Sequence, residues 1–273
     1  DYYDVIESDA DVVYISLPIA LHEKWARISA ESGKHVICEK SAAASFKSVQ
    51  KMVDTSRKNK IRIMEGFMFK FHPQHKKAME LISKGSIGKT RIFFGNFCLP
   101  LPQKDNIRLK KNLGGGVLND AGCYILSASR LIFGSEPSEI AGKLVLDSKL
   151  GIDMRASAWL KFPNDKIAFL NAGYGMKYNS SYSVLGTNGN ISLKRAFSVP
   201  PDYKAEVELK SKKSSKTFPI KPADQFKIMI DFFCKEIMEK KRKTDFENDM
   251  LKQAKAMEAI RTSSKNKLPV SLG

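Results

Sequence analysis

Cysteine and long apolar runs are both scarce in this sequence. Its 273 residues include 4 cysteines, Cys38, Cys98, Cys123 and Cys234, and no CxxC motif, which excludes a disulfide-rich scaffold and a zinc ribbon. No apolar run approaches the roughly 20 residues that span a bilayer, so we expect no membrane partner. The acidic opening, residues 1–4, lacks the basic and then apolar pattern of a signal peptide. Reduced thiols without an export signal favour a cytoplasmic protein.

Acidic residues are also few, with 29 Asp and Glu against 46 Lys and Arg and a net charge of +17. A basic surface attracts anions, including phosphorylated ligands and nucleic acids. The excess consists mainly of lysine, with 36 Lys and 10 Arg spread along the chain, whereas nucleic-acid recognition depends largely on bidentate arginine. The composition therefore favours a solvated, lysine-rich surface that steers small anionic ligands, and we expect no nucleic-acid partner.

The first part of the chain alternates short β-branched runs with amphipathic segments. The runs at 11–17, 35–38 and 62–66 predict strands, and the stretches at 21–32 and 45–59 predict helices. Strands that alternate with helices in this way predict a right-handed parallel sheet with covered faces. A ligand would then bind at the carboxyl ends of the strands.

The rest of the chain mixes helices with many strands. Helices are predicted at 73–84, 120–133, 223–239 and 246–263, and a long irregular stretch at 98–116. Strands are predicted at 90–97, 141–146, 156–162, 167–174, 182–185, 191–193 and 206–209. The predicted fold class is α/β, in which part of a parallel sheet is followed by an α+β domain with a large, mostly antiparallel open sheet. We place the two domains at 1–68 and 69–273.

Charged or turn residues follow each of the three predicted parallel strands, at the edge where such sheets bind ligands. Lys40 comes directly after the second of these strands. An ammonium there can polarise a carbonyl or hydroxyl oxygen, or relay a proton if burial lowers its pKa. Asp120 and Tyr124 are spaced i, i+4 in a predicted helix, which places both on one helix face.

Five segments resemble sequence motifs of one protein family. They are PIALH at 18–22, GKHVICEK at 33–40, EGFMFKFHP at 65–73, GGGVLNDAGCY at 114–124 and LGTNG at 185–189. In combination they are similar to motifs of the glucose–fructose oxidoreductase/inositol dehydrogenase (Gfo/Idh/MocA) family, and the resemblance spans nearly the whole chain. It implies a Rossmann-type sheet and an enzyme that transfers a hydride between NAD or NADP and a sugar, cyclitol or related polyhydroxy compound.

The resemblance also implies roles for individual residues. The implied catalytic residues are Lys40, between the nicotinamide and the substrate hydroxyl, Tyr124 as acid/base, and Asp120. Arg108, Asp120 and Tyr124 would contact the substrate. The residues implied to contact the cofactor are Ser16, Leu17, Pro18, His22, Glu39 and Lys40. The open sheet implies a homodimer or homotetramer, since such a face commonly packs against a second subunit.

Several positions depart from the family pattern. The glycine-rich GxGxxG fingerprint after the first strand is absent, and the triplet at 114–116 lies too far downstream to replace it. At roughly 30 residues per βαβ unit, about two βα units of the Rossmann domain would be missing. That missing part would include the residue that selects NAD or NADP. Ile19 and Ser41 also replace an asparagine and a proline of the family motifs.

Other hypotheses remain at this point. The chain could be a truncated form of an enzyme, or a non-catalytic, dimerising or ligand-binding relative that has lost cofactor binding. Anion or nucleic-acid binding driven by the net charge of +17 is the weakest alternative. A metal site is not expected, because His72 and His75 have no carboxylate or cysteine at ligand spacing.

The absent fingerprint leads to the first prediction. Because the glycine-rich loop supplies the backbone N–H groups that bind the pyrophosphate, the 273-residue chain should bind NAD(P) weakly or not at all. Titration calorimetry with each cofactor measures this, and tight binding of either one would contradict the prediction.

Overall fold

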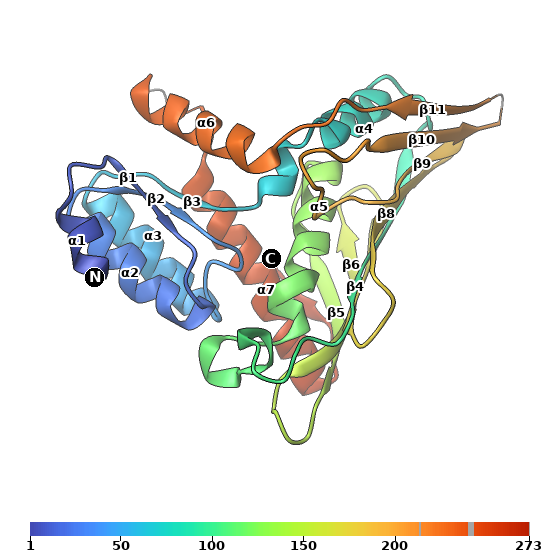
Figure 1. Ribbon diagram of the computed structural model, residues 1–273. Coiled ribbons are helices and arrows are strands. Elements are labelled where there is room, and N and C mark those ends of the chain that lie inside the picture. Colours follow the sequence, from blue (N-terminus) through green and yellow to red (C-terminus); the bar gives the residue numbers. More distant parts are fainter. Residues whose placement is uncertain (213, 240–242, 273) are drawn as a thin grey trace.

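The computed structural model describes residues 1–212, 214–239 and 243–272, which form two packed parts (Figure 1). In the N-terminal part, the described residues form three parallel strands, β1 (Val12–Ile15), β2 (His35–Cys38) and β3 (Ile63–Glu65), in that spatial order. This confirms the predicted parallel sheet. The carboxyl ends of these strands point toward the second part of the molecule (Figure 1).

Helices α2 (Ile19–Glu31) and α3 (Phe46–Lys58) connect these strands, as predicted. Helix α3 begins after Ser45, whose hydroxyl oxygen accepts a hydrogen bond from the backbone N–H of Ser48 at 3.2 Å and so caps the helix. The short helix α1 (Tyr2–Glu7) was not predicted. Its 6 residues are too few to show a helical period.

The described residues of the second part form a nine-stranded sheet in the order β11-β10-β9-β8-β4-β7-β6-β5-β12. The strands are β4 (Thr90–Leu99), β5 (Glu139–Leu146), β6 (Asp153–Phe162), β7 (Lys166–Tyr174), β8 (Asn179–Gly186), β9 (Gly189–Leu193), β10 (Glu206–Ser211), β11 (Ser215–Pro219) and β12 (Val270–Ser271). All neighbours are antiparallel except β4 and β7, which pair in parallel. The large, mostly antiparallel sheet is therefore confirmed, while the edge strands β11 and β12 were missed.

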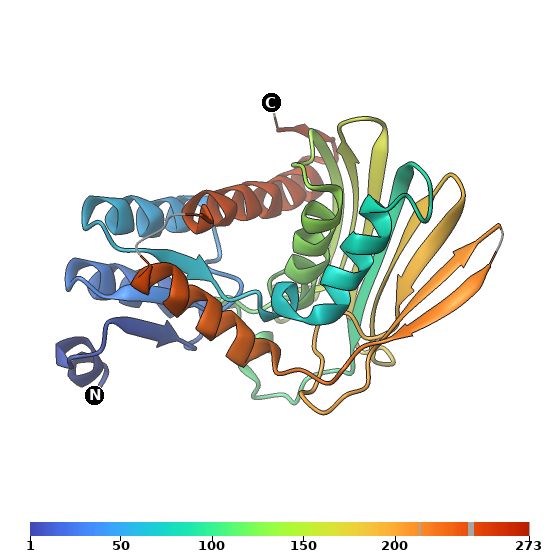
Figure 2. The same ribbon diagram turned by 90° about the horizontal axis from the view of Figure 1, so that it is seen from above.

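Helices lie against one face of the large sheet (Figure 2). They are α4 (Pro73–Ser83), α5 (Cys123–Phe133) and α7 (Phe246–Asn266), and α6 (Gln225–Met238) extends toward the small sheet. The helix predicted to begin at Asp120 begins instead with a π-helical turn over Leu118–Gly122. The irregular stretch 98–116 contains two short 3-10 turns.

The buried hydrophobic residues form two cores, one around the small sheet and one under the large sheet. Helix α5 packs so closely on β4 that a Cβ atom on Gly95 would lie 2.1 Å from Cγ2 of Ile125. Helix α7 contributes to both cores, with Met250 in the N-terminal one and Ile260 in the C-terminal one. The predicted second domain therefore also completes the core of the first. None of the described helices is long and apolar enough to cross a membrane.

A buried ion pair connects α7 to the start of β3. The Arg62 guanidinium donates from Nε to Oε1 of Glu247 at 2.7 Å, and both side chains are at most 10% exposed. The same carboxylate oxygen accepts a hydrogen bond from the backbone N–H of Ile63 at 3.3 Å. Removing the carboxylate would leave a buried guanidinium without a counter-charge.

We expect Glu247→Ala to lower the free energy of unfolding by about 3–5 kcal/mol, the usual cost of breaking a buried pair. The control is Glu258→Ala on the same helix, because Glu258 is 45% exposed in its pair with Arg261 and should cost less than about 1 kcal/mol. Urea denaturation measures both values. Equal losses in the two variants would show that the Arg62–Glu247 ion pair does not stabilise the packing of α7 against the start of β3.

Candidate functional site

Two cavities open side by side where the two parts of the molecule meet. The larger has a volume of about 540 Å³ and the smaller about 170 Å³. Lys40, Arg108 and Asp120 line both cavities, so they form the wall that the two share. Groups bound in the two cavities would meet at these three side chains.

The smaller cavity lies at the carboxyl ends of β1 and β2. Five residues that were expected to contact the cofactor line it: Ser16, Leu17, Pro18, Glu39 and Lys40. The opposite wall is the glycine triplet 114–116. Gly114 has a φ of +84°, and a Cβ atom there would lie 2.8 Å from Cβ of Ile19. Glycine is therefore required for this loop to approach the start of α2.

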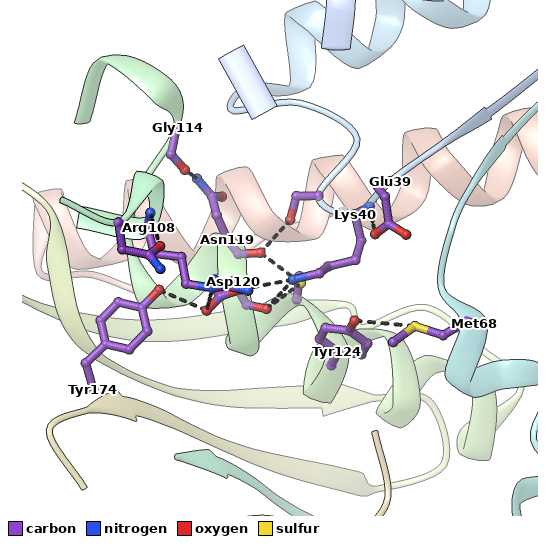
Figure 3. Close-up of polar contacts among 12 residues, drawn as sticks. Glu39, Lys40, Met68, Arg108, Gly114, Asn119, Asp120, Tyr124 and Tyr174 are labelled. Atoms are coloured by element: carbon purple, nitrogen blue, oxygen red, sulfur yellow. Dashed lines mark hydrogen bonds and ion pairs between the residues drawn. The ribbon is translucent and has the colours of Figure 1, made fainter. Parts of the chain in front are cut away.

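The ammonium group of Lys40 binds Asp120 (Figure 3). Nζ donates to the backbone oxygen of Asp120 at 2.7 Å and to its Oδ1 at 3.1 Å. Burial lowers the pKa of Lys40, but the anionic forms of Tyr124 and Asp120 outweigh burial and raise it above its ordinary value. Lys40 therefore keeps its proton near neutral pH. This favours polarisation of a substrate oxygen over the proton relay that a lowered pKa would have allowed.

Asp120 is the common partner of three side chains. Besides Lys40, its Oδ2 accepts hydrogen bonds from Nε of Arg108 at 2.9 Å and from Oη of Tyr174 at 3.1 Å (Figure 3). Burial raises the pKa of Asp120, but Lys40 and Arg108 outweigh it and hold the pKa below its ordinary value. Asp120 is thus a carboxylate that orients two cations. Tyr174 was not predicted as a site residue, since it ends strand β7 far along the chain and belongs to no motif.

Tyr124 lines the larger cavity, and its ring centroid lies 4.9 Å from Nζ of Lys40. Its hydroxyl donates to Sδ of Met68 at 3.4 Å (Figure 3), and a thioether is a weak acceptor. Burial raises the pKa of Tyr124, and Lys40 offsets only part of this. The phenol is therefore protonated near neutral pH, and a substrate oxygen would be a stronger acceptor than the sulfur. Met68 was missed as a site residue, although it lies in the segment 65–73.

The spacing of Asp120 and Tyr124 differs from the predicted i, i+4 pair of an α-helix. Asp120 belongs to the π-helical turn Leu118–Gly122, and α5 begins only at Cys123. Both side chains nevertheless line the larger cavity, as expected. Such π turns occur frequently at functional sites, because they move side chains out of the α-helical register.

His22 lies outside the linings of both cavities, unlike the other residues expected to contact the cofactor. Its side chain is buried, with Nε2 2.7 Å from the carbonyl oxygen of Leu17. Nδ1 lies 3.1 Å and 3.2 Å from the carbonyl oxygens of Ser41 and Ala42. The ring thus links the loop after β1 to the turn that carries Lys40. Burial lowers the pKa of His22, and the carbonyl oxygens only partly offset this.

Two further buried polar groups support the turn after Lys40. Ser41 Oγ donates to the backbone oxygen of Asn119 at 3.1 Å, and the Glu65 carboxylate accepts from the backbone N–H of Ala42 at 2.8 Å. The Lys40–Ser41 peptide bond is cis. Burial raises the pKa of Glu65 to about 7, although the hydrogen bond from Ala42 opposes it.

His72 and His75 make structural contacts. Nδ1 of His75 lies 3.0 Å from Oη of Tyr182, and its Nε2 lies 2.8 Å from the carbonyl oxygen of Ala196. His72 caps α4 by accepting a hydrogen bond from the backbone N–H of Gln74 at 3.3 Å. Within the described residues, no group of three or more His, Cys, Asp or Glu side chains is placed to hold a metal ion.

Comparison with known families matches most of the chain. Residues 1–67 match a model described as an oxidoreductase family with an NAD-binding Rossmann fold. Residues 75–192 match a model of the GFO/IDH/MocA C-terminal domain. Both matches agree with the resemblance found in the sequence motifs.

Several curated relatives are similar over most of their length. An uncharacterized oxidoreductase of Rhizobium meliloti is 33% identical over 86% of this chain and 72% of its own. D-xylose 1-dehydrogenase (NADP(+)) 2 of Haloferax volcanii is 31% identical over 86% of this chain and 73% of its own. dTDP-3,4-didehydro-2,6-dideoxy-alpha-D-glucose 3-reductase of Actinomadura kijaniata is 28% identical over 94% of this chain and 78% of its own.

Solved structures share the architecture of this chain and extend beyond it. The crystal structure of KijD10, a 3-ketoreductase from Actinomadura kijaniata in complex with NADP and TDP-benzene, superimposes with a TM-score of 0.91 at 28% identity over 96% of this chain and 81% of that one. Aldose–aldose oxidoreductase from Caulobacter crescentus complexed with glycerol gives a TM-score of 0.88 at 25% identity over 99% and 82%. The predicted fold class is confirmed.

The raised pKa of Glu65 predicts how stability depends on pH. The pKa of this carboxyl is about 7 in the folded chain, against an ordinary value of 4.5. Its contribution to the free energy of unfolding is therefore complete below pH 4.5 and is lost as pH rises through 7. At about 1.4 kcal/mol per unit, wild-type protein should lose about 3 kcal/mol more unfolding free energy than Glu65→Gln between about pH 5 and pH 8. Urea denaturation at both pH values measures the difference.

The matched control is Glu31→Gln, because Glu31 is 55% exposed on α2. This variant should follow the wild-type pH profile. If Glu65→Gln also followed it, the carboxyl of Glu65 would not titrate differently in the folded and unfolded chains.

Proposed function

Because the chain belongs to the Gfo/Idh/MocA family of NAD(P)-dependent oxidoreductases, we propose that it transfers a hydride between NAD(P) and a carbon of a sugar, cyclitol or related polyhydroxy compound. The observation that carries this proposal is the wall shared by the two cavities. Lys40 and Asp120 line both, and Tyr124 lines the larger one beside them. The larger cavity would hold the substrate and the smaller one the reacting end of the cofactor.

The residues around the smaller cavity fit the nicotinamide end of a dinucleotide. The cavity lies at the carboxyl ends of parallel strands, where open α/β sheets bind nucleotides, and its volume of about 170 Å³ suits one end of the cofactor. Ser16, Leu17, Pro18, Glu39 and Lys40 would hold it. When bound, NAD(P)H supplies the hydride.

Tyr124 and Lys40 act on the oxygen of the reacting carbon. In the reducing direction, the protonated Tyr124 hydroxyl donates its proton to the substrate carbonyl oxygen. The ammonium of Lys40, fixed by Asp120, stabilises the negative charge that develops on that oxygen. Arg108 and Asp120 would bind neighbouring hydroxyl groups of the substrate. In the oxidising direction, the phenolate form of Tyr124 would accept the hydroxyl proton.

A non-catalytic relative that only dimerises or binds a ligand is the alternative. The intact set of Lys40, Asp120 and Tyr124 supports the enzyme instead, because a binding protein has no need of a buried proton donor beside an ammonium.

The exposed face of the large sheet supports a proposal of self-association. Phe94 on β4 is 38% exposed, and its ring stacks on Phe169 of β7 with centroids 4.8 Å apart. A second copy packing on this face would bury these rings. We also propose 1–68 as the partial cofactor domain and 69–273 as the substrate and oligomerisation domain. The four free cysteines support a reducing, cytoplasmic location.

Removing either reacting group should slow hydride transfer. In the protein made from its whole open reading frame, we expect Lys40→Ala and Tyr124→Phe each to lower turnover by at least about 10²-fold, the usual scale for a lost acid/base group. Lys47→Ala, at an exposed lysine of α3, should leave turnover unchanged. The measurement is NAD(P)H absorbance with a sugar substrate, and unchanged turnover in both site variants would refute these roles.

A further inference from the structure

The larger cavity extends well beyond the groups that would carry out the chemistry. Lys40 and Tyr124 form one part of its lining, here called the reacting end. Tyr178 and Ser198, from the loops before β8 and after β9, form another part, here called the second end. Its volume of about 540 Å³ falls within the range of sites for ligands larger than one monosaccharide. The proposed reaction assigns no role to this second end.

An arginine lies beside this second end. Arg195 donates from Nε to the backbone oxygen of Ser198 at 2.9 Å. Its guanidinium carbon lies 5.1 Å from the ring centroid of Tyr178 and 5.4 Å from that of Tyr203. Two residues of the cavity lining, Tyr178 and Ser198, are thus in direct contact with the guanidinium group.

The position of Arg195 is fixed relative to the reacting end. Its backbone pairs with Ser180 at the start of β8. Two residues later, the buried ring of Phe197 packs against the ring of Tyr124, with centroids 5.8 Å apart. The arginine and the tyrosine are therefore held by one rigid aromatic cluster rather than by a long flexible loop.

Arg195 has no ionic partner among the residues that the structure describes. Arg108, the other arginine near this cavity, is paired with Asp120. Stacking on tyrosine faces orients a guanidinium group and leaves the donors at its edge available. A planar fork of free donors is suited to bidentate binding of an oxyanion.

We propose that Arg195 binds a phosphate group of the substrate, so that the sugar reacts at Lys40 and Tyr124 while its phosphate lies against Arg195, Tyr178 and Tyr203. This inference rests on the proposed function and narrows its substrate class to phosphate-bearing sugars. A sugar monophosphate and a nucleotide-linked sugar share this chemistry. The excess of positive charge over the whole chain would speed the approach of either one.

The competing explanation is that Arg195 only links three loops through its stacking and its hydrogen bond to Ser198. A structural role would lower stability and weaken all ligands alike. A phosphate-binding role would weaken only phosphate-bearing ligands. The decisive quantity is therefore the ratio of two affinities measured on the same variant.

The experiment is titration calorimetry of wild type, Arg195→Gln, Arg195→Lys and Arg91→Gln with four probes. The probes are D-glucose, D-glucuronate, α-D-glucose 1-phosphate and TDP-glucose. Arg91→Gln is the matched control, because Arg91 lies on β4 and is exposed, with one hydrogen bond to the carbonyl oxygen of Asn164 at 3.3 Å. It removes the same charge away from the cavity.

We expect wild type and Arg91→Gln to bind at least one phosphate-bearing probe about 10- to 100-fold more tightly than glucose, the scale of a charge-assisted hydrogen-bonded pair. Arg195→Gln should lose most of that preference, and Arg195→Lys should keep part of it. Tighter binding of glucose 1-phosphate identifies a monophosphate, and tighter binding of TDP-glucose identifies a nucleotide-linked sugar.

The proposal is overturned if Arg195→Gln keeps the wild-type preference, if no phosphate-bearing probe binds better than glucose, or if glucuronate shows the same Arg195-dependent preference. Binding is measured without hydride transfer, so the two proposals fail separately. Arg195-dependent binding without turnover would contradict only the proposed enzyme activity. Turnover of neutral sugars by a wild-type protein that binds no phosphate-bearing probe better than glucose would contradict only the phosphate assignment.

Discussion

The contact between Lys40 and Asp120 determines how the two parts of this molecule form one site. Lys40 comes from the end of a strand in the small sheet, and Asp120 from the turn that begins α5 above the large sheet, 80 residues further along the chain. A buried ion pair contributes little net stability, because the cost of removing both charges from water offsets their attraction. Here Arg108 and Tyr174 satisfy the second carboxylate oxygen. The pair thus fixes geometry more than it stabilises the fold.

Each side of that contact is held by buried polar groups that do not touch the cavities' shared wall. On the Lys40 side, His22 and Glu65 bind the backbone of the turn. On the Asp120 side, α7 supports the start of α5, since Gln253 donates to the carbonyl oxygen of Cys123 at 2.9 Å. A lysine side chain has many rotamers, so a single ion pair would not hold it in one orientation. The supports on both sides reduce that freedom before substrate binds.

Sequence motifs brought Lys40, Asp120 and Tyr124 to one predicted site because these residues follow directly from strand ends and helix starts, and all three line the larger cavity. Lys40 could be placed at the carboxyl end of a parallel strand from the local pattern alone, and its neighbour Glu39 with it. Asp120 and Tyr124 were placed in the same cavity, but through an assumed α-helical register. The π turn could not be foreseen, because no residue in Leu118–Gly122 marks a helix that widens by one residue per turn.

Other site residues were missed for reasons that lie in the tertiary structure. Tyr174 reaches Asp120 only because β7 pairs in parallel with β4, a non-local contact that no nearby residue encodes. His22 lies close to the cofactor loop in sequence, but its ring turns inward to three carbonyl oxygens, which depends on the approach of the Lys40 turn. The raised pKa of Glu65 likewise depends on its burial in the folded chain. Motifs thus predicted which residues gather at the site, whereas packing decides which of them face the cavities.

The charges around the two cavities differ in a way that suits the proposed chemistry. The larger cavity is lined by two cations, Lys40 and Arg108, and one carboxylate, Asp120, while the raised pKa of Tyr124 keeps its phenol neutral. The smaller cavity is lined in addition by the carboxylate of Glu39, which balances the charge on that side. An excess positive charge therefore faces the larger cavity alone, where the proposed substrate would bind. Where little water is present, a positive charge stabilises a developing oxyanion more strongly than the same charge does in bulk water. Because the excess charge faces the larger cavity, it favours negative charge on the oxygen of the proposed substrate.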